Sequence, residues 1–225
     1  MSITTPPPPV QQKESGLGCL GCGCAVLFVI FALIVALVAG SCYYAYTKGY
    51  ALTSATAADV PIFNGSDEIY KSTQQKLSDF DHDVKNHQAA TIHLSADEIN
   101  TMIAHSPELS AHNGHAYVSI TGDEVHLQGS IPLENLPFGI YKGRYANVDS
   151  TFGVEFDASS KQLILLLHSM KFGDQVTPNN MITALQPQLN LQLNLGLRKD
   201  VDASRLLDSA KSISVKDGEL VIETQ

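Results

Sequence analysis

The feature that most constrains this chain is a long uncharged segment near its beginning. No charged residue lies between Glu14 and Lys48, and residues 25–39 form an unbroken apolar run. A helix needs about 20 apolar residues to cross the ~30 Å hydrocarbon core of a bilayer. Tyrosines follow this run, where their amphipathic rings suit the headgroup region. Residues 16–46 are therefore predicted to form a transmembrane helix.

Two rival interpretations of this segment stay open. Ala39-Gly40-Ser41 resembles a signal-peptide cleavage site, and Cys42 loosely resembles the acylation site of a lipoprotein. A signal peptide begins with a basic region, however, and the segment before Ala25 lacks a clear basic cluster. We therefore prefer an uncleaved anchor.

The anchor also sets the expected topology. Lys13 and Lys48 flank it evenly, so the positive-inside rule favours neither orientation. A short tail inside and a large domain outside is the commoner arrangement, so we expect a single-pass protein of the plasma (inner) membrane with an extracytoplasmic C-terminal domain. The expected organisation is a disordered Pro-rich tail (1–15), the transmembrane helix (16–46), a linker (47–65) and a soluble domain (66–225).

The four cysteines lie in or beside the anchor, at positions 19, 22, 24 and 42. The first three have ligand-like spacing, but a structural zinc site needs four ligands and no second Cys or His pair accompanies them. Neither a metal nor a cofactor is therefore predicted. Ala32, Ala36 and Gly40 recur every fourth position, and small residues let membrane helices pack closely. Self-association through this stripe is the alternative to a monomeric anchor.

The rest of the chain is acidic. Residues 49–225 contain 12 Lys or Arg and 22 Asp or Glu, a net charge of −10. Proteins that bind nucleic acid generally carry basic patches that replace counterions. Nucleic acid is therefore excluded as an expected partner.

Three helices are predicted, two before the first hairpin and one after the second in chain order. Residues 67–87 carry inward positions every three or four residues, which is the helical period. Ser95 and Glu98 form a capping box that opens a second helix, and Pro107 ends it. Residues 202–211 are predicted to form a last short helix.

Three hairpins are predicted between and after these helices, because each turn aligns apolar residues on one face. Together they predict an α+β domain, in which one antiparallel sheet of about six strands packs against two or three helices. The predicted apolar pairs include Ile120 with Val125, Phe156 with Leu163, and Val215 with Leu220.

Residues 188–197 are harder to interpret. Leu alternates strictly with Asn, Gln and Gly from Leu189 to Leu197, which favours a strand. Leu and Gln are better helix formers than strand formers, so the propensity opposes the pattern. We predict a strand here.

No motif in the chain indicates catalysis. The sequence has no phosphate-binding Gly-rich loop, no nucleophile elbow and no helical zinc motif. His112 and His115 are interpreted as solvated loop histidines, and His168 as a core histidine with one partner. We expect no enzyme. The least ordinary exposed residues are Lys142, Arg144 and Tyr145, a predicted ligand-binding site whose two cations would meet an anionic lipid headgroup or a partner carboxylate.

Several stretches of the chain together carry a resemblance to known proteins: residues 16–24, 94–100, 106–109, 130–133, 142–145 and 212–222. With these stretches, the layout resembles a family of uncharacterised bacterial single-pass membrane proteins. This family carries no assigned activity, and its 189–197 region is more helical than the pattern here predicts. The order of one helix followed by hairpins is also similar, more distantly, to small anchored domains with a tubular lipid-binding type of fold.

Two functions follow as expectations. The first is a membrane-anchored, non-catalytic domain that binds an apolar ligand or lipid. The second is a structural or interaction protein that docks an envelope partner. A cavity of several hundred Å³ inside the domain would favour the first, and a solid core with an exposed apolar patch would favour the second.

Overall fold

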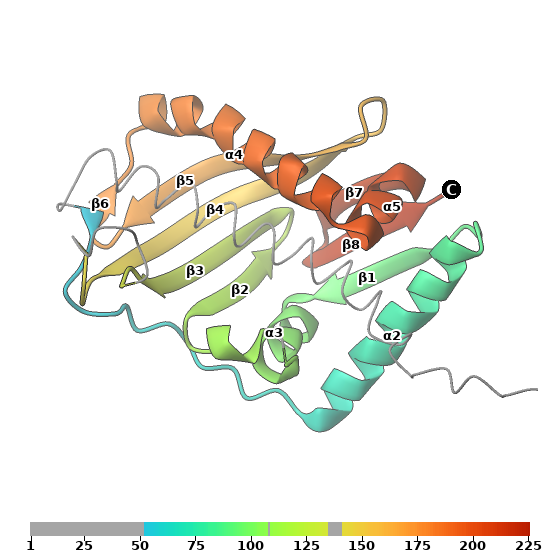
Figure 1. The fold of residues 1–225 in the computed structure, drawn as a ribbon, viewed down its shortest axis with the longest axis horizontal. Helices are drawn as coiled ribbons and strands as arrows, with labels where there is room; N and C mark the ends of the chain where they lie inside the picture. The colour runs from blue at the N-terminus through green and yellow to red at the C-terminus, as the bar shows by residue number, and fades with distance from the viewer. Residues whose placement is uncertain (1–51, 108, 135–140) are drawn as a thin grey trace, which may run out of the picture.

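The computed structural model describes residues 52–107, 109–134 and 141–225. Within these ranges the chain is α+β, with two antiparallel sheets and four α-helices (Figure 1). The transmembrane helix predicted for 16–46 lies outside them. In the part that is described, no helix has the length and apolarity needed to cross a membrane.

The larger sheet contains five strands in the order β2-β3-β4-β5-β6. Its registers confirm the first two predicted hairpins, including Ile120 opposite Val125 and Phe156 opposite Leu163. One register shift, between Thr151 and Phe152, interrupts the pairing of β4 with β5. The strands are β2 (Ala116–Thr121), β3 (Glu124–Pro132), β4 (Tyr145–Asp157), β5 (Gln162–Phe172) and β6 (Gln175–Val176).

The smaller sheet has the order β1-β8-β7, with β1 at Thr91–Ser95, β7 at Ala210–Lys216 and β8 at Glu219–Thr224. It confirms the third hairpin, with Val215 opposite Leu220. The prediction of a single sheet was wrong, because the sequence pattern pairs neighbouring strands but does not show that β1 joins β8. β7 contacts β4, and one hydrophobic core joins both sheets.

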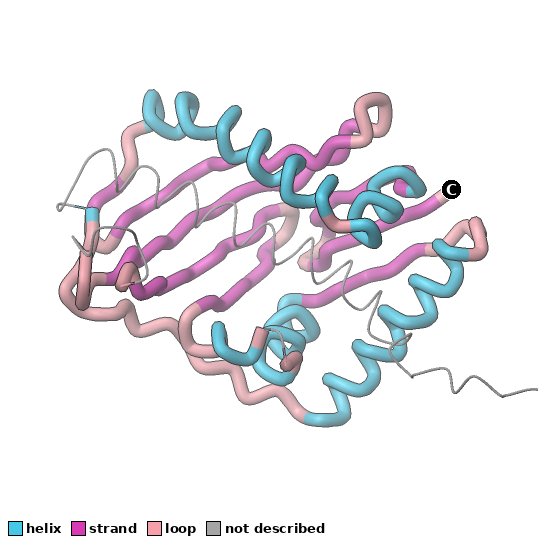
Figure 2. Tube along the Cα trace, in the orientation of Figure 1, coloured by secondary structure: helices cyan, strands magenta, loops and turns pink. Residues whose placement is uncertain are grey.

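Two helices pack beside β1 and β2. Helix α2 (Asp67–Lys85) buries Leu77 and Phe80, and helix α3 (Ala96–His105) begins with the predicted capping box. A short 3₁₀ helix, η2 (Ser110–His112), follows α3. Figure 2 shows these helices on one side of the strands and α4 with α5 on another.

The strand predicted for 188–197 is wrong. These residues belong to helix α4 (Asn179–Lys199), and α5 (Val201–Ser209) follows directly. Leu189, Leu193 and Leu197 are buried because a four-residue spacing also places them on one helix face. Leucine at every second position also places leucine at every fourth position, so the pattern is compatible with a helix as well as with a strand.

A second row of α4 covers the outer edge of β5. The Leu163 amide donates to Asn194 Oδ1 (3.0 Å), and Asn194 Nδ2 donates back to the Leu163 carbonyl (2.8 Å). Asn190 makes the same two bonds with Leu165, at 2.9 and 3.3 Å. Four helical residues rise about 6 Å and two strand residues about 6.6 Å, so the two repeats stay in step. Unpaired strand edges invite other chains, and α4 closes this one.

The opposite edge of the same sheet is closed in the same way. Asn100 of α3 is 1% exposed and pairs with both backbone groups of Val118 on β2. Helix side chains therefore occupy the hydrogen-bonding positions that a further strand would take on both sides of the sheet.

Candidate functional site

An extended strap, defined here as residues 52–65, crosses the outer face of the five-stranded sheet. At its start, Ser54 forms an antiparallel bridge with Tyr145, with both backbone hydrogen bonds at 2.9 Å. The Arg144 guanidinium donates to the hydroxyl and the carbonyl of Thr53. The first residues of the strap are therefore fixed to the beginning of β4.

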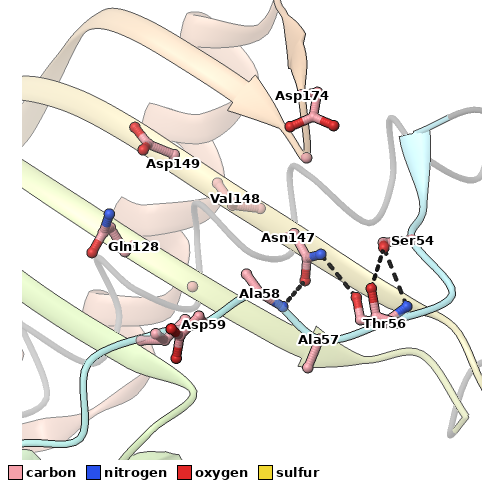
Figure 3. Close-up of a pocket in the computed structure, with 13 residues that line it drawn as sticks. Ser54, Thr56, Ala57, Ala58, Asp59, Gln128, Asn147, Val148, Asp149 and Asp174 are labelled. Atoms are coloured by element: carbon pink, nitrogen blue, oxygen red, sulfur yellow. Dashed lines mark hydrogen bonds between the residues drawn. The ribbon is translucent and has the colours of Figure 1, made fainter.

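The middle of the strap is held by Asn147 of β4. This side chain, 9% exposed, accepts from the Ala58 amide at 3.0 Å and donates to the Thr56 carbonyl at 3.0 Å. The Ser130 hydroxyl donates to the Asn147 amide oxygen and accepts from the same Ala58 amide. Figure 3 shows Asn147 between the strap and the sheet.

The far end of the strap is held by a second carboxamide. Asn113 accepts from the Phe63 amide at 3.1 Å and donates to the Phe63 carbonyl at 3.2 Å. The ring of Phe63 lies 6.5 Å from that of Tyr117 on β2. The segment predicted as a linker thus hydrogen-bonds to the domain over most of its described length.

Between the strap and the sheet lies a cleft of about 330 Å³. Strap residues 54–60 form one wall, β3 and β4 form the floor, and the turn between β5 and β6 closes one end. Its lining is mostly polar and includes Gln128 and Asn147 (Figure 3).

The cleft is negatively charged. Asp59 of the strap, Asp149 of β4 and Asp174 of the β5–β6 turn contribute carboxylates from three different segments. None of the described residues that line it is Lys or Arg. Asp149 accepts a 2.9 Å hydrogen bond from His126, a side chain beside the cleft. The arrangement suits a cationic group, because three separate segments contribute carboxylates to the lining of one cleft.

These carboxylates do not form a metal site. In the described ranges, no three His, Cys, Asp or Glu side chains come together closely enough to hold a metal ion. A divalent cation would need several converging oxygen ligands. An organic cation, which tolerates longer and looser contacts, fits the spacing better.

His126 raises the question of catalysis. Ser119, His126 and Asp149 lie on β2, β3 and β4, and Ser119 stands directly opposite His126. Among the described contacts, however, the Ser119 hydroxyl has no hydrogen bond to His126, and the His126 ring pairs with Asp149 instead. A nucleophile needs a base within hydrogen-bond reach, so this row gives no support to acyl transfer.

Two of the three predicted site residues hold the strap, and none of the three lines the cleft. Lys142 is exposed in the turn that precedes β4, where Gly143 has a φ of +71°. Arg144 binds Thr53, and Tyr145 pairs with Ser54, which itself lines the cleft. The three residues therefore share a turn, but their side chains do not converge on one ligand position.

One histidine differs from its prediction. His168 is not a core residue: its side chain is 45% exposed and pairs with Glu124 at 2.8 Å on the outer face of the sheet. It follows the buried Leu167 in β5, so the alternation of the strand turns it away from the core. Burial, together with the nearby His115, lowers the pKa of His112.

Comparison of the chain with protein-family models, with curated proteins and with solved structures gave no match. The resemblances drawn from its sequence segments therefore stay predictions.

Sequence reasoning missed the cleft because its residues are ordinary when taken singly. Asp59 lies in a stretch without a clear period, and Asp149 and Gln128 read as outward residues of strands. No spacing in the chain connects them. The one available signal was the outward position of Asn147 beside Asp149, which places an amide and a carboxylate on the same strand face.

Proposed function

We propose that this chain is a single-pass, membrane-anchored and non-catalytic docking module, whose cleft receives an ammonium or guanidinium group of an envelope partner. The observation that carries the proposal is the cleft of about 330 Å³, with carboxylates from three segments and no Lys or Arg among its described lining residues. The net charge of −10 over residues 49–225 adds a favourable long-range field for a cation.

The cleft supports docking better than the alternative of an apolar ligand or lipid tail. Sites for apolar ligands are lined mainly by hydrophobic and aromatic side chains. This cleft includes Val60 and Val148 but no aromatic residue among its described lining. Most of the buried apolar side chains in the described ranges pack instead into one core shared by the two sheets.

The strength of the interaction follows from the exposure of its charges. Asp59 and Asp174 are exposed, and exposed ion pairs contribute about 0–1 kcal/mol each. We therefore expect modest affinity that falls as the salt concentration rises. Such weak docking is sufficient for a partner that is held at the same membrane, because anchoring both proteins in one bilayer raises their local concentration.

The test is crosslinking in whole cells. A photoreactive amino acid replaces Ala57, a residue of the cleft wall, in the full-length chain. We expect a crosslinked partner segment rich in Lys or Arg, and capture should be lost in the double variant Asp59→Asn with Asp174→Asn. Neither carboxylate forms a hydrogen bond or an ion pair within the described residues, so the double variant should fold normally.

A matched control removes the same charge elsewhere. The double variant Asp123→Asn with Glu155→Gln neutralises two exposed carboxylates of the same sheet that do not line the cleft. Equal capture by both double variants would refute the proposal. Capture of an aminophospholipid instead of a protein would assign the cationic group to a lipid headgroup and remove the protein partner.

A further inference from the structure

Exposed apolar side chains gather in one part of the described chain. Six large hydrophobic residues are exposed within the described ranges, and four of them lie between β6 and the start of α5. They are Val176 (67% exposed), Leu191 (52%), Leu195 (47%) and Val201 (72%).

The same part of the chain carries no negative charge along its helix. From Gln175 to Lys199 there is no Asp or Glu, the longest such run after residue 48 in this acidic chain. The first acidic residues beyond it are already engaged: Asp200 caps the Ala203 amide at 2.8 Å, and Asp202 pairs with Arg205 at 2.5 Å. Helix α4 can therefore approach an anionic surface without the repulsion that other faces would meet.

The outward row of α4 has no role inside the fold. One row, with Leu193, fills the core, and a second, with Asn194, closes the edge of β5. Leu191 and Leu195 form a third row, one helical turn apart, and about half of each side chain is exposed to solvent. Lys199 ends the helix in an exposed position. An apolar row with a cation at its end is typical of helices that lie in the membrane interface.

The position of the strap brings this surface close to the bilayer. Residues 47–51 separate the predicted anchor from Leu52, and five residues span at most about 18 Å. Ser54 and Asp174 line the same cleft, so the start of the strap lies next to the turn that leads to β6 and α4 (Figure 1). The domain therefore cannot move far from the membrane, and α4 begins at the tethered end.

We propose that the α4 surface, defined as Val176, Leu191, Leu195, Lys199 and Val201, rests on the anionic bilayer that holds the anchor. The apolar side chains enter the headgroup region, and Lys199 meets lipid phosphates. This inference rests on the membrane anchor of the proposed function but not on the cleft. It orients the domain, because it assigns α4 to the membrane side.

The test uses the full-length chain in nanodiscs that contain phosphatidylglycerol and phosphatidylcholine. An environment-sensitive fluorescent amino acid replaces Leu191, Leu195 or, as the control, Ile69, an exposed apolar residue of α2 (37% exposed). Headgroup-labelled quencher lipids should quench the probe about twofold or more at 191 and 195, and leave it unchanged at 69. Replacing Lys199 with Gln should weaken quenching in the anionic discs.

Three outcomes would overturn the inference. Equal and weak quenching at 191, 195 and 69 would leave α4 in water. A blue shift that requires two copies of the chain per disc, without quenching by lipid, would assign the surface to self-association. A chain that fails to enter nanodiscs would remove the anchor and with it the proposed function, whereas an inserted chain with an unquenched α4 would remove this inference alone.

Discussion

The carboxamide of Asn100 pairs with Val118 as a neighbouring strand would: it donates to the Val118 carbonyl at 2.6 Å and accepts from the Val118 amide at 3.0 Å. Asn190 and Asn194 do the same for Leu165 and Leu163 at the other edge of the sheet. A side-chain amide carries one donor group and one acceptor, the same pair that a strand backbone presents. Helix amides therefore take the place of a further strand at Val118 on one edge of the sheet, and at Leu163 and Leu165 beyond the short pairing of β6 on the other.

Replacing Asn100 with Ala should destabilise the domain by about 2–3 kcal/mol, because both backbone groups of Val118 would be left buried without partners. Chemical unfolding of the full-length protein in detergent, followed by tyrosine fluorescence because the chain has no Trp, measures this loss. Asn180→Ala is the matched control, since Asn180 is exposed on α4. A loss no larger than that of the control would contradict the pairing.

Replacing Asn190 and Asn194 together with Ala should cost about 1–2 kcal/mol for each residue and also expose the edge of β5. We expect concentration-dependent association of the variant in size-exclusion chromatography, because an open edge pairs with other chains. Gln192→Ala, an exposed change on the same helix, should leave both stability and elution unchanged. Because Ala favours helix, the double variant should keep α4 helical, and any loss would come from the missing amides. A stable and monodisperse double variant would therefore show that the amides are dispensable.

Replacing Asn147 with Ala should release the middle of the strap, since the Ala58 amide and the Thr56 carbonyl lose their shared partner. Limited proteolysis of the full-length chain should then cut within residues 54–60 at least about fivefold faster. This rate corresponds to a fall of about 1 kcal/mol in the free energy needed to open the strap locally. Thr151→Ala, on the same strand, serves as the control. Equal cleavage rates in the two variants would mean that Ser54 and Asn113 hold the strap without help.

Glu98 links stability to pH. Its burial raises the pKa, but the hydrogen bond and charge of Lys76 and the bonds from Ser95 outweigh this, so the pKa of Glu98 lies below its ordinary 4.5. A carboxyl with a lowered pKa in the folded state stabilises the fold above pH 4.5 and loses that contribution as the pH falls through the folded-state pKa. Glu98→Gln should therefore lower stability near pH 7 and flatten the acid dependence below pH 4.5.

Gln at this position still completes a capping box, so the helix end should stay intact while the ion pair with Lys76 is lost. Unfolding midpoints measured at several acidic pH values give the slope of stability against pH. Glu155→Gln, which removes an exposed carboxylate from β4, is the comparison. If both variants keep the slope of the unaltered protein, Glu98 has no part in the pH response.

Local order was predictable from the sequence, and the way its parts assemble was not. The hairpin registers followed from alternation and turn residues, and the capping box at Ser95 and Glu98 was visible as a motif. The separation into two sheets depends on β1 joining β8 over more than a hundred residues, which no local pattern records. Residues 91–94 did alternate between exposed and buried positions, a signal that could have predicted β1.

The candidate site was less predictable than the fold. Arg144 was chosen for its charge, but its guanidinium serves the strap because Thr53 folds back onto it. The cleft depends on a strap that lacks any secondary-structure period, so its walls could be located only in three dimensions. The α4 segment was misread for a different reason: its leucines fit the periods of both a strand and a helix, and the strand pattern was given more weight than the helix propensity of Leu and Gln. In the structure, α4 packs against β5.

The amide row of α4 binds backbone atoms of β5. The pairing therefore does not depend on which side chains β5 carries, but it does depend on the number of residues between the two asparagines. A substitution at Ile164 or Leu166 leaves the backbone groups of β5 where the amides meet them. A single residue inserted between Asn190 and Asn194 would rotate the rest of the helix by about 100° and turn Asn194 away from Leu163. Over generations, the outward positions of β5 should therefore accept changes of residue freely, while α4 rejects insertions and deletions and the buried positions of β5 stay apolar.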